Sequence, residues 1–92
     1  MKHEIYRKIP NELKKQRKIS GLSQKDIAKL LGLKTTSRIS QWEKGAGMPS
    51  LVNVFKLSSL YGVLVDALFI ELVRVLRKEM KEKREKCFES KR

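Results

Sequence analysis

Apolar side chains recur three and four residues apart along most of the chain, which is the period of helices packed on one face. Five helical segments follow from this spacing, and no segment alternates as a strand does. The residues predicted to face inward are Leu13, Arg17 and Ile19; Ile27, Ala28, Leu30 and Leu31; Ile39 and Trp42; Leu51, Val54, Phe55 and Leu57; and Tyr61 and Phe69. The pattern therefore predicts an all-α fold without an internal repeat.

Polar caps and glycines set the expected ends of these helices. The predicted amino-terminal caps are Asn11, Ser23, Thr35 and Ser50, and the predicted stops are Ser20-Gly21, Gly32, Gly45 and Tyr61-Gly62. Asp26 follows Ser23 by three residues, as in a capping box. A fifth helix is expected to begin near Asp66 and to continue to about Phe88, because neither proline nor glycine interrupts it.

The charge of the chain narrows the choice of partner. Its 92 residues carry a formal net charge of +12, and residues 1–64 hold most of it, with 13 basic and 4 acidic side chains. Such an excess attracts an anionic partner, and nucleic acid is the first candidate. An anionic membrane surface and a merely soluble basic protein are the alternatives at this point.

Other functional classes lack the residues that they need. A single cysteine, Cys87, and a single distant histidine, His3, predict neither a disulfide nor a metal site and fit a reduced cytoplasm. The longest apolar stretch is interrupted by Asp66 and is shorter than the roughly 20 residues of a membrane span. Residues 1–10 also lack the apolar region of a signal peptide. With no catalytic constellation and no cofactor motif, the sequence predicts a protein that is not an enzyme.

Two adjoining motifs carry the most specific signal. They are Leu22-Ser23-Gln24-Lys25-Asp26-Ile27-Ala28-Lys29-Leu30-Leu31-Gly32 and Ile39-Ser40-Gln41-Trp42-Glu43-Lys44-Gly45, followed by Pro49-Ser50-Leu51. Over about residues 11–70 the chain resembles the Cro and lambda-repressor-like helix-turn-helix family. The resemblance implies a compact five-helix DNA-binding domain and a bacterial or phage transcriptional regulator, most simply a repressor, that binds operator DNA in the cytoplasm.

The third helix has the surface that such a role requires. With Ile39 and Trp42 facing inward, its outer face is polar, and a major groove is wide enough to admit it. The family pattern places Thr36, Ser37 and Gln41 at base-reading positions, with Arg38 close enough to join them or to contact a phosphate. Gln41 is the preferred residue, since a glutamine can pair with adenine N6 and N7.

Other residues are expected to position the protein rather than to read bases. In the family pattern Gln24 grips the phosphate backbone, and Lys44 and Ser40 are expected to contact phosphates as well. For Lys25 and Lys34, a phosphate contact and a solvated lysine are equally good interpretations.

Structural support is expected from Arg17 and Glu43, which pair in this family and tie the first helix to the recognition helix. Trp42 could stack on an unpaired base, as in single-strand binders, but its spacing with Ile39 favours packing in the core.

One departure from the family pattern concerns the turn. Between Gly32 and Glu43 the chain has one additional residue, which the predicted cap at Thr35 places at Leu33-Lys34. An alternative alignment places it at the start of the helix, which makes Thr35 rather than Thr36 the base-reading residue.

The chain is thus divided into an arm (1–10), the DNA-binding domain (11–70) and a helical extension (71–92). In the extension Phe69, Val73, Leu76 and Met80 form a short heptad stripe. Part of this stripe is expected to cover the globular core, and the remainder predicts a homodimer through this helix. The alternative function is an antitoxin-like module that holds a partner protein through this helix while repressing its own promoter.

Overall fold

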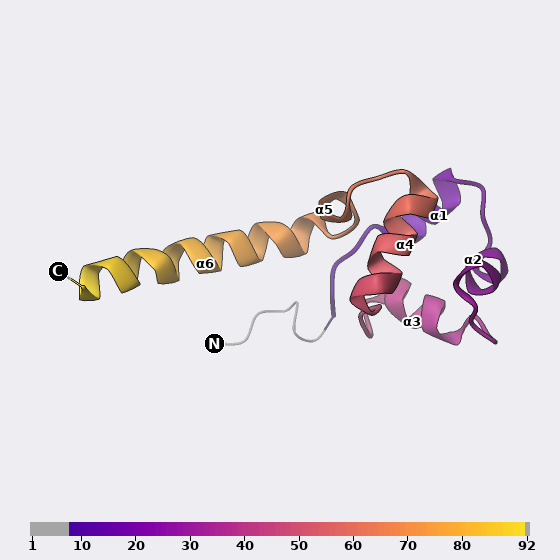
Figure 1. The fold of residues 1–92 in the computed structure, drawn as a ribbon, viewed down its shortest axis with the longest axis horizontal. Coiled ribbons are helices and arrows are strands. Elements are labelled where there is room, and N and C mark those ends of the chain that lie inside the picture. The colour runs from indigo at the N-terminus through magenta and orange to yellow at the C-terminus, as the bar shows by residue number, and fades with distance from the viewer. Residues whose placement is uncertain (1–7, 92) are drawn as a thin grey trace.

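The computed structural model describes residues 8–91, and every regular element in this range is a helix. The helices are α1 (Leu13–Ile19), α2 (Gln24–Leu31), α3 (Ser37–Lys44), α4 (Leu51–Tyr61), α5 (Val65–Leu68) and α6 (Ile70–Ser90). Helices α1 to α5 form a globular head, and α6 projects from it as a single rod (Figure 1). The all-α prediction is confirmed.

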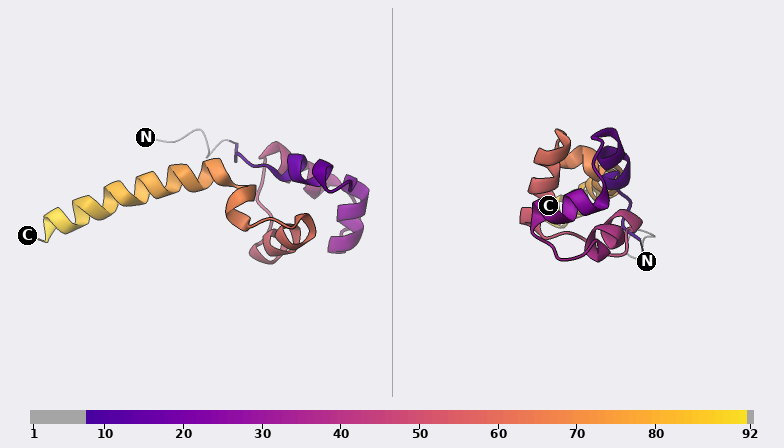
Figure 2. Two further views of the ribbon diagram at one scale, coloured as in Figure 1. Left: turned by 90° about the horizontal axis from the view of Figure 1, so that it is seen from above. Right: turned by 90° about the vertical axis from the view of Figure 1, so that its right-hand side faces the viewer.

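The core of the head is small and is made by one or two side chains from each helix. Its buried residues are Leu13, Ile27, Ala28, Ile39, Trp42, Val54, Leu57, Leu68 and Phe69. The view from above shows α6 leaving the head on one side, and the view from the end shows the helices of the head arranged around a common centre (Figure 2). Trp42 and Phe69 are core residues, as the spacing predicts.

Most of the predicted helix ends are observed. Ser23 and Asp26 form a capping box at α2, and Gly32 ends that helix in the left-handed conformation. The Ser50 side chain accepts a hydrogen bond from the Asn53 N–H and caps α4. These local signals were sufficient because each involves residues no more than three positions apart.

The observed caps of α1 and α3 each lie one residue after the predicted ones. Helix α1 begins after Glu12, although Asn11 still accepts a hydrogen bond at 3.0 Å from the Leu13 N–H. Helix α3 is capped by Thr36 rather than Thr35, whose hydroxyl instead accepts a weaker bond at 3.3 Å from the Ser37 N–H. The helix therefore starts at Ser37.

The expected single fifth helix is also wrong. Phe69 has φ −131° and ψ 41°, and this non-helical residue separates α5 from α6. Phe69 is only 4% exposed, and the carbonyl oxygen of Leu68 accepts a hydrogen bond from the Glu12 N–H at 2.8 Å. Tertiary contacts with the start of α1 thus break the helix where the sequence contains no local breaker.

Several apolar residues predicted to face inward are exposed. They are Ile19 (69%), Leu30 (55%), Leu51 (72%) and Phe55 (56%). Helices of seven to eleven residues have room for about one buried side chain a turn against a core of this size. The inward stripes are consequently narrower than the sequence pattern predicts.

Candidate nucleic-acid interface

Helices α2 and α3 and the turn between them form the unit that carries the expected site residues. Ile27 and Ala28 of α2 pack in the same core as Ile39 and Trp42 of α3, which fixes the two helices relative to each other. The turn bends through residues 32–36, starting from Gly32 at φ +75°. Helix α3 is thereby held with one face in the core and the opposite face in solvent.

The solvent face of α3 is polar and carries no acidic side chain. Ser37, Gln41 and Lys44 follow one another at helical spacing and are all exposed. Arg38 is exposed on one flank of this face, and Ser40 is half-buried on the other. Hydroxyl, amide and cationic groups thus line a helix face of the kind that enters a major groove.

Thr36 is placed less openly than Ser37 and Gln41. It is the half-buried cap of α3, with its backbone at φ −88° and ψ 0°. Its carbonyl oxygen accepts a hydrogen bond from the Ser40 N–H at 2.9 Å. Of the expected base-reading residues, the structure therefore brings Ser37, Arg38 and Gln41 to the surface and leaves Thr36 at its edge.

Behind this face, a buried carboxylate joins three helices. Glu43 of α3 accepts hydrogen bonds from Arg17 Nε at 2.6 Å and from Arg17 Nη2 at 3.1 Å. The Glu43 side chain is only 4% exposed and the Arg17 side chain only 11%. The hydrogen bond to Glu43 is the main reason why the pKa of Arg17 is raised above its ordinary value, against the opposing effect of burial. This is the ion pair that the family resemblance implies.

Gln24 adds a contact that sequence reasoning did not identify. Its Nε2 donates to Glu43 Oε1 at 3.0 Å, so α2 joins the same cluster. The remaining Arg17 nitrogen, Nη1, donates to the Leu22 carbonyl oxygen at 3.1 Å. We refer to Arg17, Gln24 and Glu43 as the Glu43 cluster, which ties the recognition helix to α1 and α2.

The carboxyl end of α3 is fixed by a second missed contact. Asn11 Nδ2 donates to the carbonyl oxygens of Trp42 and Ile9, both at 3.0 Å. The Ile9 N–H also donates to the Gly45 carbonyl oxygen at 2.9 Å. The segment before α1 thus runs against the end of α3, and the only sequence signal for it was Asn11, which was predicted as a helix cap.

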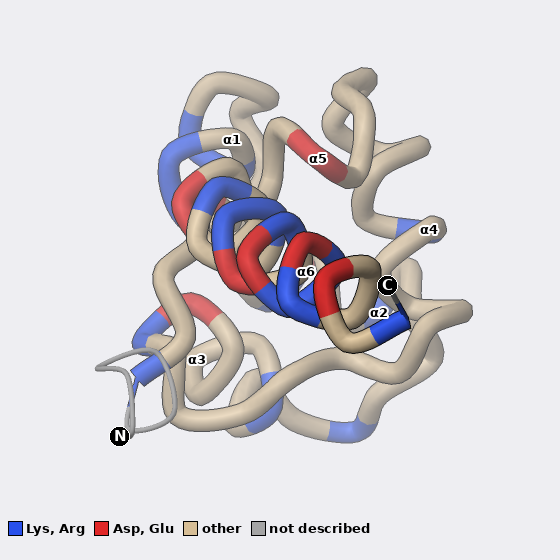
Figure 3. Tube along the Cα trace, turned by 90° about the vertical axis from the view of Figure 1, so that its left-hand side faces the viewer, with Lys and Arg blue, Asp and Glu red and all other residues tan. Residues whose placement is uncertain are grey.

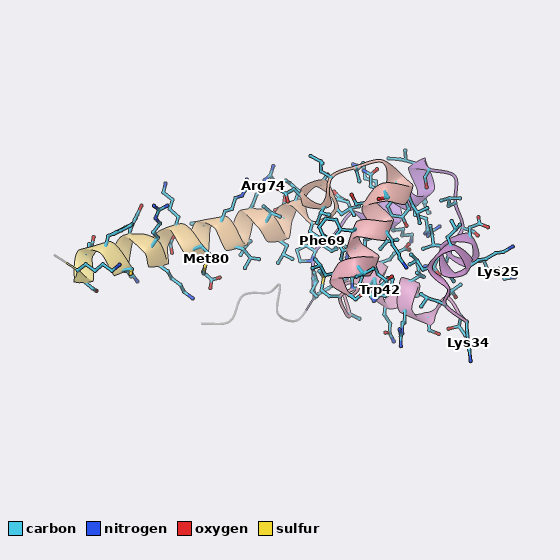
Figure 4. The ribbon with its side chains drawn as sticks, viewed as in Figure 1. Lys25, Lys34, Trp42, Phe69, Arg74 and Met80 are labelled. Atoms are coloured by element: carbon cyan, nitrogen blue, oxygen red, sulfur yellow. The ribbon has the colours of Figure 1, made fainter. Side chains whose placement is uncertain are left out.

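Exposed cations lie on α2, in the turn and at the end of α3. Lys25 at the start of α2 and Lys34 in the turn both project from the end of the head that lies opposite the free end of α6, whereas Trp42 lies within the head (Figure 4). A hollow of about 300 Å³ at the turn is lined by residues that include Lys34 and Arg38. Lys44, at the end of α3, is exposed as well.

Residues 8–91 contain no group of three or more potential metal ligands, and none of their helices is long and apolar enough to cross a membrane. The sequence predicted no metal site at His3, and this residue lies outside the described residues. What the arrangement supports chemically is hydrogen bonding and charge recognition by a rigid, outward-facing helix.

Fold and site together define a helix-turn-helix DNA-binding domain. A family model described as helix-turn-helix matches residues 13–68, which is more than half of the chain. The chain is also 40% identical over 62 residues to an uncharacterised HTH-type transcriptional regulator of Methanocaldococcus jannaschii, covering 67% of this chain and 92% of that protein. The chain belongs to the helix-turn-helix family and is a DNA-binding transcriptional regulator, not an enzyme.

Proposed function

We propose that this regulator is a repressor that binds a specific operator in duplex DNA as a homodimer. The observation that carries the proposal is the exposed, acid-free face of α3, held rigidly from behind by the Glu43 cluster. A helix presented in this way can enter a major groove without rearrangement, so little conformational entropy is lost on binding. Occupying an operator then excludes polymerase from the promoter.

Base reading falls to the residues at the centre of the α3 face. Gln41 is exposed and has an amide that can bond to adenine N6 and N7 together, a contact worth roughly 1 to 3 kcal/mol of discrimination. Ser37 lies one turn before it, and Arg38 flanks both. Thr36, at the half-buried cap, reads an adjoining base only at the edge of the contact.

Phosphate contacts surround the base-reading residues. Lys25, Lys34 and Lys44 supply exposed ammonium groups, and Ser40 supplies a hydroxyl at the flank of α3. Gln24 can take part as well, because an amide NH₂ has two donors and only one of them is used on Glu43. In this arrangement the phosphate contacts fix the register of the protein on DNA without specifying a sequence.

Selection from random duplexes with the full chain tests sequence-specific binding. The expected result is an enriched motif, and Gln41→Ala relaxes preference at one base pair of it. Lys44→Ala weakens binding to all sequences and lowers the salt slope by about one unit, since one phosphate contact is lost. Recovery of no motif contradicts specific recognition.

Lys78→Ala on α6 is the matched control for Lys44→Ala, because it removes the same exposed charge outside the head. It is expected to leave both the motif and the salt slope unchanged. Repression is tested separately, by transcription in vitro from a promoter that overlaps the recovered motif. Unchanged or increased transcript at saturating protein contradicts the repressor role.

A further inference from the structure

Residues 8–11, which we call the strap, cross the carboxyl end of α3 and are fastened to it. The Ile9 N–H donates to the Gly45 carbonyl oxygen at 2.9 Å. The Asn11 amide donates to the carbonyl oxygens of Ile9 and Trp42, both at 3.0 Å. The described chain accordingly begins beside α3 (Figure 3), so whatever the strap carries lies next to the end of that helix.

The strap is stiff for its length. Pro10 fixes its own φ and restricts the residue before it to extended conformations. Ile9 packs against the core of the head, and Asn11 also accepts a hydrogen bond from the Leu13 N–H at 3.0 Å. The chain that follows Lys8 is thus held by packing, by hydrogen bonds and by a proline. The direction in which this lysine leaves the head is therefore set before any partner binds.

Lys8 and Lys44 form a pair of exposed cations at this end of α3. Lys44 is the last residue of the helix, and Gly45 follows it as the cap. The Cγ of Lys8 lies 2.9 Å from the point that a Cβ on Gly45 would occupy, so the Lys8 side chain passes directly beside the cap. Within residues 8–91, no carboxylate forms an ion pair with either lysine. Both ammonium groups are therefore available to an external anion.

The size of α3 indicates which anion lies within reach. Its eight residues, at roughly 1.5 Å each, make a helix about 12 Å long, which is close to the width of a major groove. A helix of that length in the groove brings its ends near the phosphates that form the groove walls. The carboxyl end of a helix carries a partial negative charge, which disfavours a phosphate there. Two cations, Lys8 and Lys44, outweigh that charge.

From these observations we propose that Lys8 binds a phosphate of the DNA backbone beside the one that Lys44 contacts, and that Asn11 is the positioning residue that holds the strap for this contact. The inference rests on the proposed function, because it requires α3 to lie in the major groove. It adds the strap to a DNA-binding unit whose family match begins only at residue 13. The competing explanation is that Lys8 offsets the negative end of α3 and stabilises the head without touching DNA.

The salt dependence of DNA binding separates the two explanations, since each phosphate contact that is lost lowers the slope of log affinity against log salt by about 0.9. The affinity of the full chain for a fluorescent duplex carrying the selected motif is measured by anisotropy between about 50 and 200 mM salt. Lys8→Ala is expected to lower the slope by about one unit per bound chain and to weaken binding several-fold. Lys8→Arg keeps the charge and is expected to keep the slope.

Lys78→Ala is the matched control for Lys8→Ala, because it removes an equally exposed lysine from α6, outside the head. It is expected to leave the slope at the wild-type value. An unchanged slope in Lys8→Ala, or an equal fall in Lys78→Ala, overturns the phosphate contact. Urea unfolding of the same variants adds a second reading, since a lower stability of Lys8→Ala with an unchanged slope assigns Lys8 to the helix end alone.

A double variant tests the positioning role of Asn11. Asn11→Ala removes the bonds to the Ile9 and Trp42 carbonyl oxygens, so Lys8 is no longer held beside α3. Adding Lys8→Ala to Asn11→Ala is expected to lower the slope by less than about half a unit, because the two residues act through one contact. A full loss of about one unit in the double variant overturns the positioning role, since Asn11 then supports only the fold.

The outcome for the wild type keeps this inference distinct from the proposed function. Recovery of a motif that the wild-type chain binds with a steep salt slope leaves specific DNA binding intact, even where the Lys8 variants overturn the strap contact. A wild-type chain that selects no motif contradicts the proposed function and the inference together.

Discussion

Replacing Arg17 by methionine is expected to destabilise the domain far more than breaking an equally short ion pair on its surface. The change removes three hydrogen bonds and leaves the Glu43 carboxylate, 4% exposed, with only Gln24 as a donor. An uncompensated buried charge costs about 3 to 5 kcal/mol. A chain of 92 residues has a total stability of roughly 5 to 14 kcal/mol, so this one change removes a large fraction of it.

The chain contains a matched control. Arg74 and Glu71 of α6 approach to 2.7 Å, nearly the same distance as the buried pair, but their side chains are 68% and 59% exposed. Arg74→Met is expected to cost no more than about 0.5 kcal/mol, because water solvates the remaining carboxylate. Urea unfolding followed through the fluorescence of Trp42, the only tryptophan and a core residue, measures both variants.

A double variant separates burial of charge from loss of packing. Arg17→Met with Glu43→Leu removes both charges and keeps similar volumes, so it should recover at least about 2 kcal/mol of the loss caused by Arg17→Met alone. If Arg17→Met costs less than about 1 kcal/mol, the carboxylate is not desolvated as the structure indicates. Equal losses in the single and double variants refute the reasoning as well.

Three further predictions concern single positions. Gly45→Ala should lower the free energy of unfolding, measured in urea, by at least about 2 kcal/mol, because φ is +78° and the new Cβ meets the Ile9 oxygen at 2.5 Å. Gly32→Ala, where φ is +75° but the space is open, should lower it by about 1 kcal/mol. Burial raises the pKa of Tyr61 to about 12, so the stability it contributes below pH 10 is lost as pH rises toward 12, and Tyr61→Phe should flatten alkaline unfolding there. Hydrogen bonds at the α2 cap lower the pKa of Asp26 in the folded protein. The stability that Asp26 contributes is therefore present above about pH 3.8 and is lost as pH falls through its lowered pKa. Asp26→Asn should reduce the loss of stability on acidification.

How much of the fold was predictable depended on how local each signal is. The capping box of Ser23 and Asp26 and the glycine stop at Gly32 involve neighbouring residues, and both were predicted correctly. The break at Phe69 was not, because it depends on burial of that ring and on the hydrogen bond between Glu12 and Leu68. Periodicity also could not show that Leu30 lies outside the core, since it occurs three residues after the buried Ile27.

The candidate site was predictable as a set of positions but not as a set of contacts. The family resemblance placed Gln41 and Lys44 on the recognition helix, and the structure places both in solvent. It could not show that the Gln24 amide bonds to Glu43 or that Asn11 holds the end of α3, because these contacts join residues 19 and 31 positions apart. Such pairs are identified only once the helices are packed.

The two faces of α3 separate stability from recognition within eight residues. Ile39, Trp42 and Glu43 make the contacts that hold the helix, whereas Ser37 and Gln41 are exposed and support nothing in the head. Exposed substitutions away from packed groups usually change stability by no more than about 0.5 kcal/mol. If the outer face reads DNA as proposed, its residues can be exchanged to change the sequence that is bound without unfolding the domain. A change on the inner face instead lowers DNA binding by lowering the folded fraction. DNA affinity expressed per folded molecule distinguishes the two kinds of variant. Only changes on the outer face are expected to alter which sequence is bound.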